Sequence, residues 1–276
     1  MAKQAEPDPA LTTSGLVAGL VSVTFRDLSA AEVVDLATNA GLSAIEWGGD
    51  VHVPQGDVDT ATKVGALCRE SGLDVVSYGS YFRAGDTDQG EFSDVVRTAQ
   101  ALGAPSIRVW AGTVGSAPAT EEQRESVASS LASAVDKAEA AGLRVALEFH
   151  PNTLTDTVRS TLNLLEQVDR DTLGTYWQPG RGTPPLLAAE QVRALLPRLS
   201  VIHAFSWAKD GTREPLAEQE EMWTGVLNVA AADDREHPVL LEFVAEDDPK
   251  TFAADAKTLL GWLQALPGGK PAEPAD

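Results

Sequence analysis

Short apolar runs alternate with longer segments of helical periodicity along almost the whole chain. In four places a helical segment ends in glycine, and an apolar run begins one to three residues later. Glycine at that point is the usual left-handed stop of a helix. The four segments are NAGLSAIEW (39–47), ESGLDVVSY (70–78), ALGAPSIRVW (101–110) and AAGLRVALEF (140–149). This recurrence predicts helices that lead directly into buried strands.

Two of the expected helices have recognisable starts. Ser29 with Glu32, and Thr120 with Gln123, match the pattern in which a capping side chain and the residue three positions later satisfy free backbone amides. In the helix expected over 120–141, apolar residues recur every three or four positions, which predicts one buried stripe. That stripe consists of Val127, Leu131, Val135 and Ala138.

The apolar runs predict eight strands. Their expected ranges are 16–25, 44–48, 74–81, 106–112, 144–150, 173–179, 199–206 and 238–244. Each is followed by a helix-compatible segment, the last over 249–266. Strict alternation of helices with near-continuous apolar strands calls for a parallel sheet, and eight such units close a (β/α)8, or TIM, barrel. The main alternative is an open doubly wound sheet, but no G-x-G-x-x-G turn follows the first strand.

One α/β domain is therefore expected over 15–266, because no linker or shift in composition divides the chain. Residues 1–14 lack the apolar core of a signal peptide and are expected to form a disordered leader. Residues 267–276 are expected to form a disordered tail.

Composition narrows the class of protein. The 276 residues are 43% hydrophobic, enough for one core, and the single cysteine, Cys68, excludes an internal disulfide framework and fits a cytoplasmic protein. No run approaches about 18 apolar residues, so no membrane-spanning helix is expected. The formal charge is −20, with 41 acidic and 21 basic residues and no basic cluster. Nucleic acid and anionic membranes are therefore poor partners, since both require a basic footprint.

Four polar residues interrupt apolar strands close to their carboxyl ends: Glu148, Gln178, His203 and Glu242. An unpaired carboxylate is costly in such a buried position, so the four are expected to converge on one charged object. Active sites of (β/α)8 barrels lie at this end of the strands. Two carboxylates, an imidazole and an amide oxygen predict a site for one divalent metal ion, with Mn²⁺ favoured and Mg²⁺, Co²⁺ or Zn²⁺ as alternatives.

The alternation of side chains along a strand assigns their faces. In 144–150, Val145, Leu147 and Phe149 are expected to point out to the helices, and Ala146, Glu148 and His150 into the barrel. In 238–244, Val239, Leu241 and Phe243 are expected to point out, and Glu242 in. Phe205 and Trp207 share the inward face of His203, and Tyr176 shares that of Gln178.

Several local motifs make the chain similar to a known family. They are GLSAIEWGGDVH (41–52), LGAPSIRVWAG (102–112), VALEFH (145–150), VIHAFSW (201–207) and LLEFV (240–244). The chain resembles the sugar isomerase/epimerase family with a xylose-isomerase-like barrel, which includes hydroxypyruvate isomerases, ketose 3-epimerases, inosose dehydratases and the endonuclease IV branch. The last branch requires three zinc ions and a histidine-rich ligand set, whereas this chain has four histidines.

The resemblance implies a ligand set and a departure from it. In the isomerase branch, strands five to eight supply a Glu, an Asp, a His and a Glu to one divalent ion. Glu148, His203 and Glu242 match three of these positions, but the usual Asp-x-x-His is replaced by the run from Gln178 to Arg181. Three outcomes are open: Gln178 still binds the metal, more weakly; Arg181 replaces part of the cation's charge; or only ligand binding remains.

The resemblance also implies a mechanism. In the epimerases of the family, two carboxylates on opposite faces of a bound ketose move a proton next to the carbonyl, and the metal stabilises the enediolate. Glu148 and Glu242 are the expected catalytic pair. A lyase or dehydratase acting on a keto-sugar or keto-glycoside begins with the same proton abstraction. The remaining alternatives are a non-catalytic sugar-binding barrel and, for the two glutamates, simple ion pairs with arginines inside the barrel.

Five further residues are expected to contact the substrate, a small sugar or keto-sugar: Glu46, His52, Arg108, His150 and Arg181. For Glu46 and His52, a barrel-lining salt bridge and a loop histidine are equally good explanations. Arg108 is also a natural counter-ion for Glu46 or Glu148. The long polar segment over 207–222 fits a lid. A homo-oligomer is left open.

Overall fold

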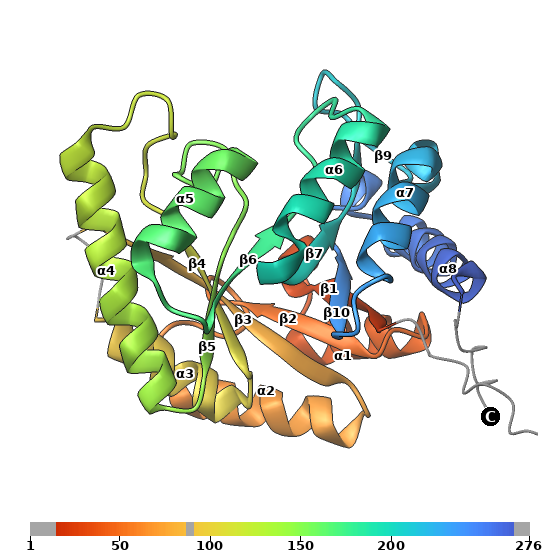
Figure 1. The fold of residues 1–276 in the computed structure, drawn as a ribbon. Coiled ribbons are helices and arrows are strands. Elements are labelled where there is room, and N and C mark those ends of the chain that lie inside the picture. Colours follow the sequence, from red (N-terminus) through yellow and green to blue (C-terminus); the bar gives the residue numbers. More distant parts are fainter. Residues whose placement is uncertain (1–14, 87–90, 268–276) are drawn as a thin grey trace, which may run out of the picture.

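The computed structural model describes residues 15–86 and 91–267. In these residues, eight parallel strands close a barrel in the order β1, β10, β7, β6, β5, β4, β3, β2. Figure 1 labels these strands in a side view. The strands are β1 (Leu16–Val21), β2 (Ala44–Gly48), β3 (Asp74–Arg83), β4 (Ser106–Trp110), β5 (Arg144–Leu147), β6 (Leu173–Trp177), β7 (Leu199–Ala204) and β10 (His237–Leu241). The predicted single (β/α)8 barrel is confirmed. The expected leader over 1–14, and the expected tail apart from residue 267, lie outside the described residues.

Helices cover the outside of the barrel (Figure 1). They are α1 (Ala30–Asn39), α2 (Val58–Glu70), α3 (Phe92–Leu102), α4 (Glu121–Ala140), α5 (Val158–Val168), α6 (Pro185–Leu195), α7 (Glu220–Ala230) and α8 (Pro249–Ala265). Short 3-10 turns form η1 (Ser22–Phe25), η2 (Leu196–Arg198), η3 (Leu216–Gln219) and η4 (Ala245–Asp247). Within the described ranges, no helix is both long and apolar enough to cross a membrane.

The predicted helix caps and glycine helix stops are present in the structure. Ser29 and Thr120 both form complete capping boxes, at the starts of α1 and α4. The four predicted glycine stops all have positive φ, where glycine avoids the strain of a Cβ: Gly41, Gly72, Gly103 and Gly142. The predicted stripe of α4 is buried.

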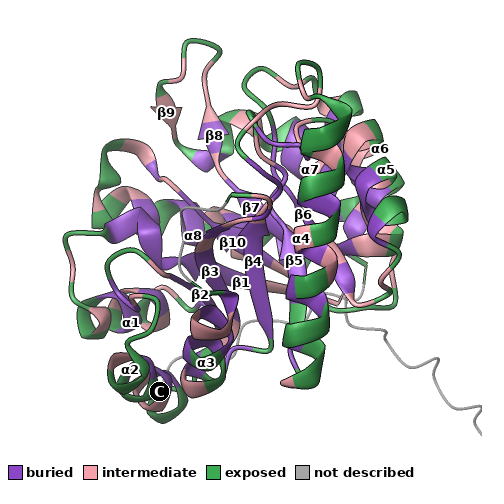
Figure 2. Cartoon of the chain, turned by 90° about the vertical axis from the view of Figure 1, so that its left-hand side faces the viewer, coloured by how far each residue is buried: buried purple, intermediate pink, exposed green. Residues whose placement is uncertain are grey.

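Apolar side chains form two cores, one on each side of the barrel wall. Val145, Leu147 and Phe149 belong to the outer core, between strands and helices, as alternation predicts. Ala146 and Tyr176 belong to the smaller core inside the barrel. Figure 2 shows the resulting layers, with buried strands enclosed by helices whose outer faces are exposed.

Six of the eight barrel strands end earlier than predicted, whereas β2 ends as predicted and β3 two residues later, and the early end of β10 changes one assignment. β10 stops at Leu241, so Glu242 and Phe243 follow the strand instead of lying within it. Phe243 has a φ of 55°, and its ring lines the cavity instead of packing on the helices. Its backbone N–H donates to Thr24 Oγ1 at 3.2 Å. The left-handed turn breaks the alternation, so the predicted outward direction of Phe243 is wrong and Val244 takes the outer position.

The segment over 207–222, predicted to be a lid, contributes to a short hairpin and contacts α8. The strands β8 (Ser206–Trp207) and β9 (Arg213–Glu214) pair as an antiparallel hairpin above the barrel, visible in Figure 2. Asp255 on α8 accepts the backbone N–H of Leu216 at 2.8 Å. A closing motion of this hairpin stays a prediction.

Candidate functional site

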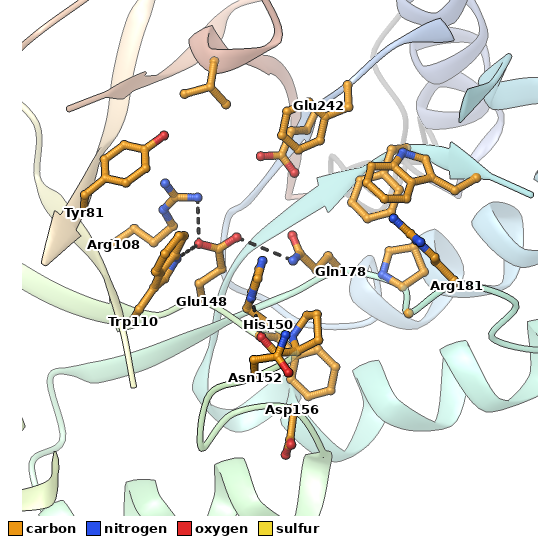
Figure 3. Close-up of a pocket in the computed structure, with 18 of the residues that line it drawn as sticks. Tyr81, Arg108, Trp110, Glu148, His150, Asn152, Asp156, Gln178, Arg181 and Glu242 are labelled. Carbon is orange, nitrogen blue, oxygen red and sulfur yellow. Dashed lines mark hydrogen bonds and ion pairs between the residues drawn. The ribbon is translucent and has the colours of Figure 1, made fainter. Parts of the chain in front are cut away.

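A cavity of about 750 Å³ opens at the carboxyl ends of the barrel strands. Figure 3 shows Glu148, Gln178 and Glu242 near its centre, with Tyr81 and Trp110 on one side and Arg181 on the other. Each of the three central residues directly follows a strand, β5, β6 or β10. The parallel barrel therefore gathers them, because its strand ends meet on one face.

The four predicted metal ligands form one continuous line of contacts. Glu148 Oε1 lies 3.5 Å from Gln178 Nε2, and Gln178 Oε1 lies 3.2 Å from His203 Nδ1. His203 Nδ1 in turn lies 3.4 Å from Glu242 Oε2. All four side chains are buried, and His203 lies below the cavity floor, since it is not among the lining residues.

The donor set fits a divalent cation only when Gln178 is counted as a ligand. Neighbouring ligands of such an ion lie roughly 3 Å apart when metal–ligand bonds are about 2.1 Å. The contacts of His203 Nδ1 with Gln178 Oε1 and Glu242 Oε2 approach this spacing. In the described ranges, no three His, Cys, Asp or Glu side chains are grouped closely enough to hold a metal by themselves. An amide oxygen is an acceptable ligand for a hard cation, so Gln178, His203 and Glu242 suit a weakened version of the site. Glu148 contacts Gln178 through the amide nitrogen, which is a hydrogen-bond donor and not a ligand atom.

Arg108 neutralises part of the negative charge. Its Nη1 lies 2.9 Å from Glu148 Oε2, and its Nε lies 3.4 Å from Glu46 Oε1. Burial by itself lowers the pKa of Arg108, but Glu148 and Glu46 outweigh that effect and raise it, so the guanidinium stays charged. The Trp110 indole N–H also donates to Glu148 Oε2. The ion pair expected as an alternative for Glu148 is present and holds this carboxylate at the cavity wall.

Glu46 lies deeper in the barrel than predicted for a substrate contact. It is fully buried, accepts a hydrogen bond from Tyr176 Oη at 2.7 Å and another from Ser77 Oγ, and is not among the cavity-lining residues. Burial raises the pKa of Glu46, but Arg108 and His203 outweigh burial and lower it to about 2. Its position matches the barrel-lining acid with a salt bridge.

Three buried polar atoms point at one another inside the barrel without a hydrogen-bond partner: Glu46 Oε1, Arg108 Nε and His203 Nε2. His203 Nε2 lies 3.7 Å from Glu46 Oε1. Burial lowers the pKa of His203, but Glu242 and Glu46 outweigh it and raise it to about 10. The imidazole thus lies between two carboxylates, Glu242 on its cavity side and Glu46 below.

His52 does not join the site. Its Nδ1 lies 3.2 Å from Ser22 Oγ, its Nε2 lies 3.0 Å from Leu28 O, and its ring packs against Trp47. The residue is buried and absent from the cavity lining. Both ring nitrogens are occupied, so its position corresponds to the loop histidine and not to the predicted substrate contact.

His150 and Arg181 both line the cavity, as predicted for substrate contacts. The His150 ring stacks on Trp110 with centroids 5.2 Å apart, and its Nδ1 lies 2.7 Å from Pro151 O. The Arg181 guanidinium lies 4.9 Å from the centre of the Trp207 ring. Their roles stay predictions.

Tyr81 and Asn152 are among the lining residues that were not predicted from the sequence. Asn152 adopts a φ of 62°, a left-handed conformation that asparagine tolerates. The PN pair after the fifth strand was the available signal for a turn at that place. Tyr81 had no comparable signal, because it lies on β3 in a run that reads as ordinary strand.

Comparison with known proteins identifies the family. The family model described as xylose isomerase-like TIM barrel matches residues 34–266, and the chain belongs to this family. A 3-dehydroshikimate dehydratase from Bacillus anthracis is 23% identical over 273 residues, which cover 87% of this chain and 95% of that protein.

Solved structures agree on the fold. A probable 3-DHS dehydratase from Bacillus anthracis superposes with a TM-score of 0.74 at 20% identity, covering 88% of this chain and 98% of the other. A D-allulose 3-epimerase from Methylomonas sp. gives 0.67 at 17% identity, covering 90% and 98%. A xylose isomerase-like TIM barrel protein from Mycobacterium smegmatis in complex with magnesium gives 0.69 at 15%, covering 90% and 97%. The fold is thus shared by epimerases and a dehydratase.

Proposed function

We propose that this protein is a divalent-metal-dependent isomerase or epimerase of a small sugar or keto-sugar. The observation that carries the proposal is the line of contacts from Glu148 through Gln178 and His203 to Glu242, at the floor of an open cavity. Mn²⁺ is the proposed ion, held by these four residues. When bound, it would polarise the substrate carbonyl and make the neighbouring C–H more acidic.

Side chains of the protein carry out proton transfer and hold the substrate. Glu148 and Glu242 act as the proton acceptor and the proton donor at the carbon next to the carbonyl. Arg108 and the Trp110 indole keep Glu148 in place, because each binds its Oε2. His150 and Arg181 border the cavity and are positioned to contact hydroxyl groups of the substrate.

A dehydratase is the second candidate. The 23% identity with a 3-dehydroshikimate dehydratase over most of both chains favours it. Dehydration begins with the same loss of a proton next to a carbonyl, and differs in the bond that breaks next. Product analysis separates the two: an epimerase or isomerase conserves the formula of its substrate, whereas a dehydratase releases water.

Deuterium incorporation tests the shared chemistry. The Mn²⁺-loaded protein, incubated in deuterated water with a panel of ketoses and keto-glycosides, is expected to place deuterium at the carbon next to the carbonyl. Glu148→Gln and Glu242→Gln should each stop net turnover, because an amide cannot take up the proton. One of the two variants is expected to retain exchange without product, which identifies the residue that acts second.

Metal content is measured for every variant, since both glutamates are also proposed ligands. A variant that keeps its Mn²⁺ but loses turnover supports a role in proton transfer. Tight binding of a keto-sugar by the loaded wild-type protein without any deuterium incorporation contradicts the proposal and favours a sugar-binding barrel.

A further inference from the structure

The cavity is larger than a single sugar requires. Its volume is about 750 Å³. Cavities of about 300–1,000 Å³ hold drug-sized ligands, and a hexose is smaller than these. A substrate placed at Glu148 and Glu242 therefore leaves space beside it. The side chains around that space indicate what occupies it.

Three aromatic residues form one side of this space: Phe205, Trp207 and Phe243, here called the aromatic flank. The rings of Phe205 and Trp207 have centroids 5.2 Å apart, and those of Trp207 and Phe243 lie 6.0 Å apart. Their planes are tilted by 41° and 53°, so the flank is curved. All three line the cavity and are only partly buried. A curved set of partly exposed rings accepts a flat ring by face and edge contacts.

Two residues of the aromatic flank are close in sequence to the proposed metal ligands. Phe205 follows His203 by two residues, and Phe243 directly follows Glu242. The left-handed backbone of Phe243 turns its ring into the cavity, where alternation alone would turn it outward. A bulky residue held in a strained conformation at a cavity is a reason to look for a function.

The three side chains of the flank offer a sugar hydroxyl only one hydrogen-bonding group, the Trp207 indole N–H. The charged neighbours of the flank are Arg181, 4.9 Å from the Trp207 ring centre, and Arg213, 4.8 Å from that of Phe243. Both guanidinium groups lie within cation–π distance of these rings. Glu148 and Glu242 lie near the centre of the cavity (Figure 3), so the reacting sugar belongs there, beside the flank.

We infer that the aromatic flank is a subsite for a planar aromatic group joined to the reacting sugar. The substrate class is then an aryl glycoside of a keto-sugar, instead of a free monosaccharide. This inference rests on the proposed function, because it places the sugar unit at Glu148 and Glu242.

A matched pair of probes tests the subsite: the methyl and phenyl glycosides of 3-oxo-glucose, which differ only in the group expected at the flank. With Mn²⁺-loaded wild-type protein, calorimetry is expected to show the phenyl glycoside binding about tenfold more tightly, because its ring is buried against three others. Trp207→Ala should abolish this preference, and Trp207→Phe should keep most of it. Trp262→Ala is the matched control, since Trp262 lies on α8 and does not line the cavity.

The outcomes separate the subsite from the proposed chemistry. Equal affinities for the two glycosides, with deuterium incorporated into both, overturn the subsite and leave the proposed function standing. A phenyl preference that depends on Trp207, without deuterium in either glycoside, supports the subsite and contradicts the chemistry. Absence of binding for both glycosides overturns the subsite. Melting temperatures close to that of the wild type confirm that Trp207→Ala is folded.

Discussion

At the scale of single residues, Gln178 is the position at which this chain departs from the ligand pattern of the family it resembles. A neutral amide takes the place of a carboxylate, and it contacts both Glu148 and His203. The loss of one negative charge weakens attraction to a cation. Arg108 further reduces the negative charge around the site. The site is therefore expected to bind its metal, but less tightly than a site with four charged or basic ligands.

Two substitutions test this account of the metal. His203→Ala should abolish retention of Mn²⁺, and Gln178→Asp should tighten binding several-fold, because an anionic ligand replaces a neutral one. Calorimetric titration with Mn²⁺ measures both. His52→Ala is the control, since His52 is also buried but lies outside the site. Unchanged metal affinity in His203→Ala would remove the proposed metal site.

Glu46 is a second residue whose effect on metal binding can be predicted. Its Oε1 faces His203 Nε2 at 3.7 Å, on the side of the imidazole opposite to Glu242. A carboxylate in that position orients a histidine ligand and makes it more basic. Glu46 is therefore expected to act as a positioning residue for His203, because it does not reach the cavity.

The variant Glu46→Gln keeps the shape of the side chain and removes its charge. It should weaken Mn²⁺ affinity by about 10–100-fold. Glu46→Asp should restore part of the loss. Ser77→Ala is the comparison, because it removes one hydrogen bond to Glu46 and leaves the charge in place. An equal loss of affinity in Ser77→Ala would indicate a purely structural role for Glu46.

At the scale of elements, the turn between α7 and β10 is tied to η2. Arg235 donates to the carbonyl oxygens of Leu196 and Pro197, and Asp233 binds both Arg235 and His237. The hydrogen bond from Arg235 is the main cause that lowers the pKa of Asp233 to about 2. These contacts fix the chain where it enters the last strand of the barrel.

A depressed pKa predicts how this turn depends on pH. The ionised Asp233 stabilises the fold fully above its unfolded pKa of about 3.9, and that contribution is lost as the pH falls through the folded pKa. Asp233→Asn should lower the melting temperature by about 2–4 °C at pH 7, if roughly 1 kcal/mol is lost. The difference from the wild type should shrink at pH 3. A difference that is constant over pH 3–7 would contradict the role of the charge.

At the scale of the whole molecule, charge is distributed unevenly. The chain carries a formal charge of −20, yet arginines and carboxylates occur in equal number around the cavity. These are Arg26, Arg108, Arg181, Glu148, Asp156 and Glu242. The acidic surface discourages polyanions, while the cavity itself is balanced.

Much of this organisation could be predicted from the order of residues. Alternation of apolar runs with glycine-ended helices predicted the barrel, since the periods of strands and helices are local properties. Because the carboxyl ends of parallel strands lie on one face of a barrel, the sequence predicted that Glu148, Gln178, His203 and Glu242 lie close together. Face alternation was correct along β5, where the backbone remains regular.

Tertiary structure decided the rest. Glu46 pairs with Arg108 instead of lining the cavity because β2 places its side chain deep in the barrel, level with side chains of β4 and β7. The stagger between strands of the closed barrel sets this depth. The His52 side chain lies outside the cavity, where its two ring nitrogens contact Ser22 Oγ and Leu28 O. Phe243 faces the cavity because the chain leaves β10 through a left-handed turn. Such outcomes follow from contacts between distant segments, which the local period of hydrophobic residues does not encode.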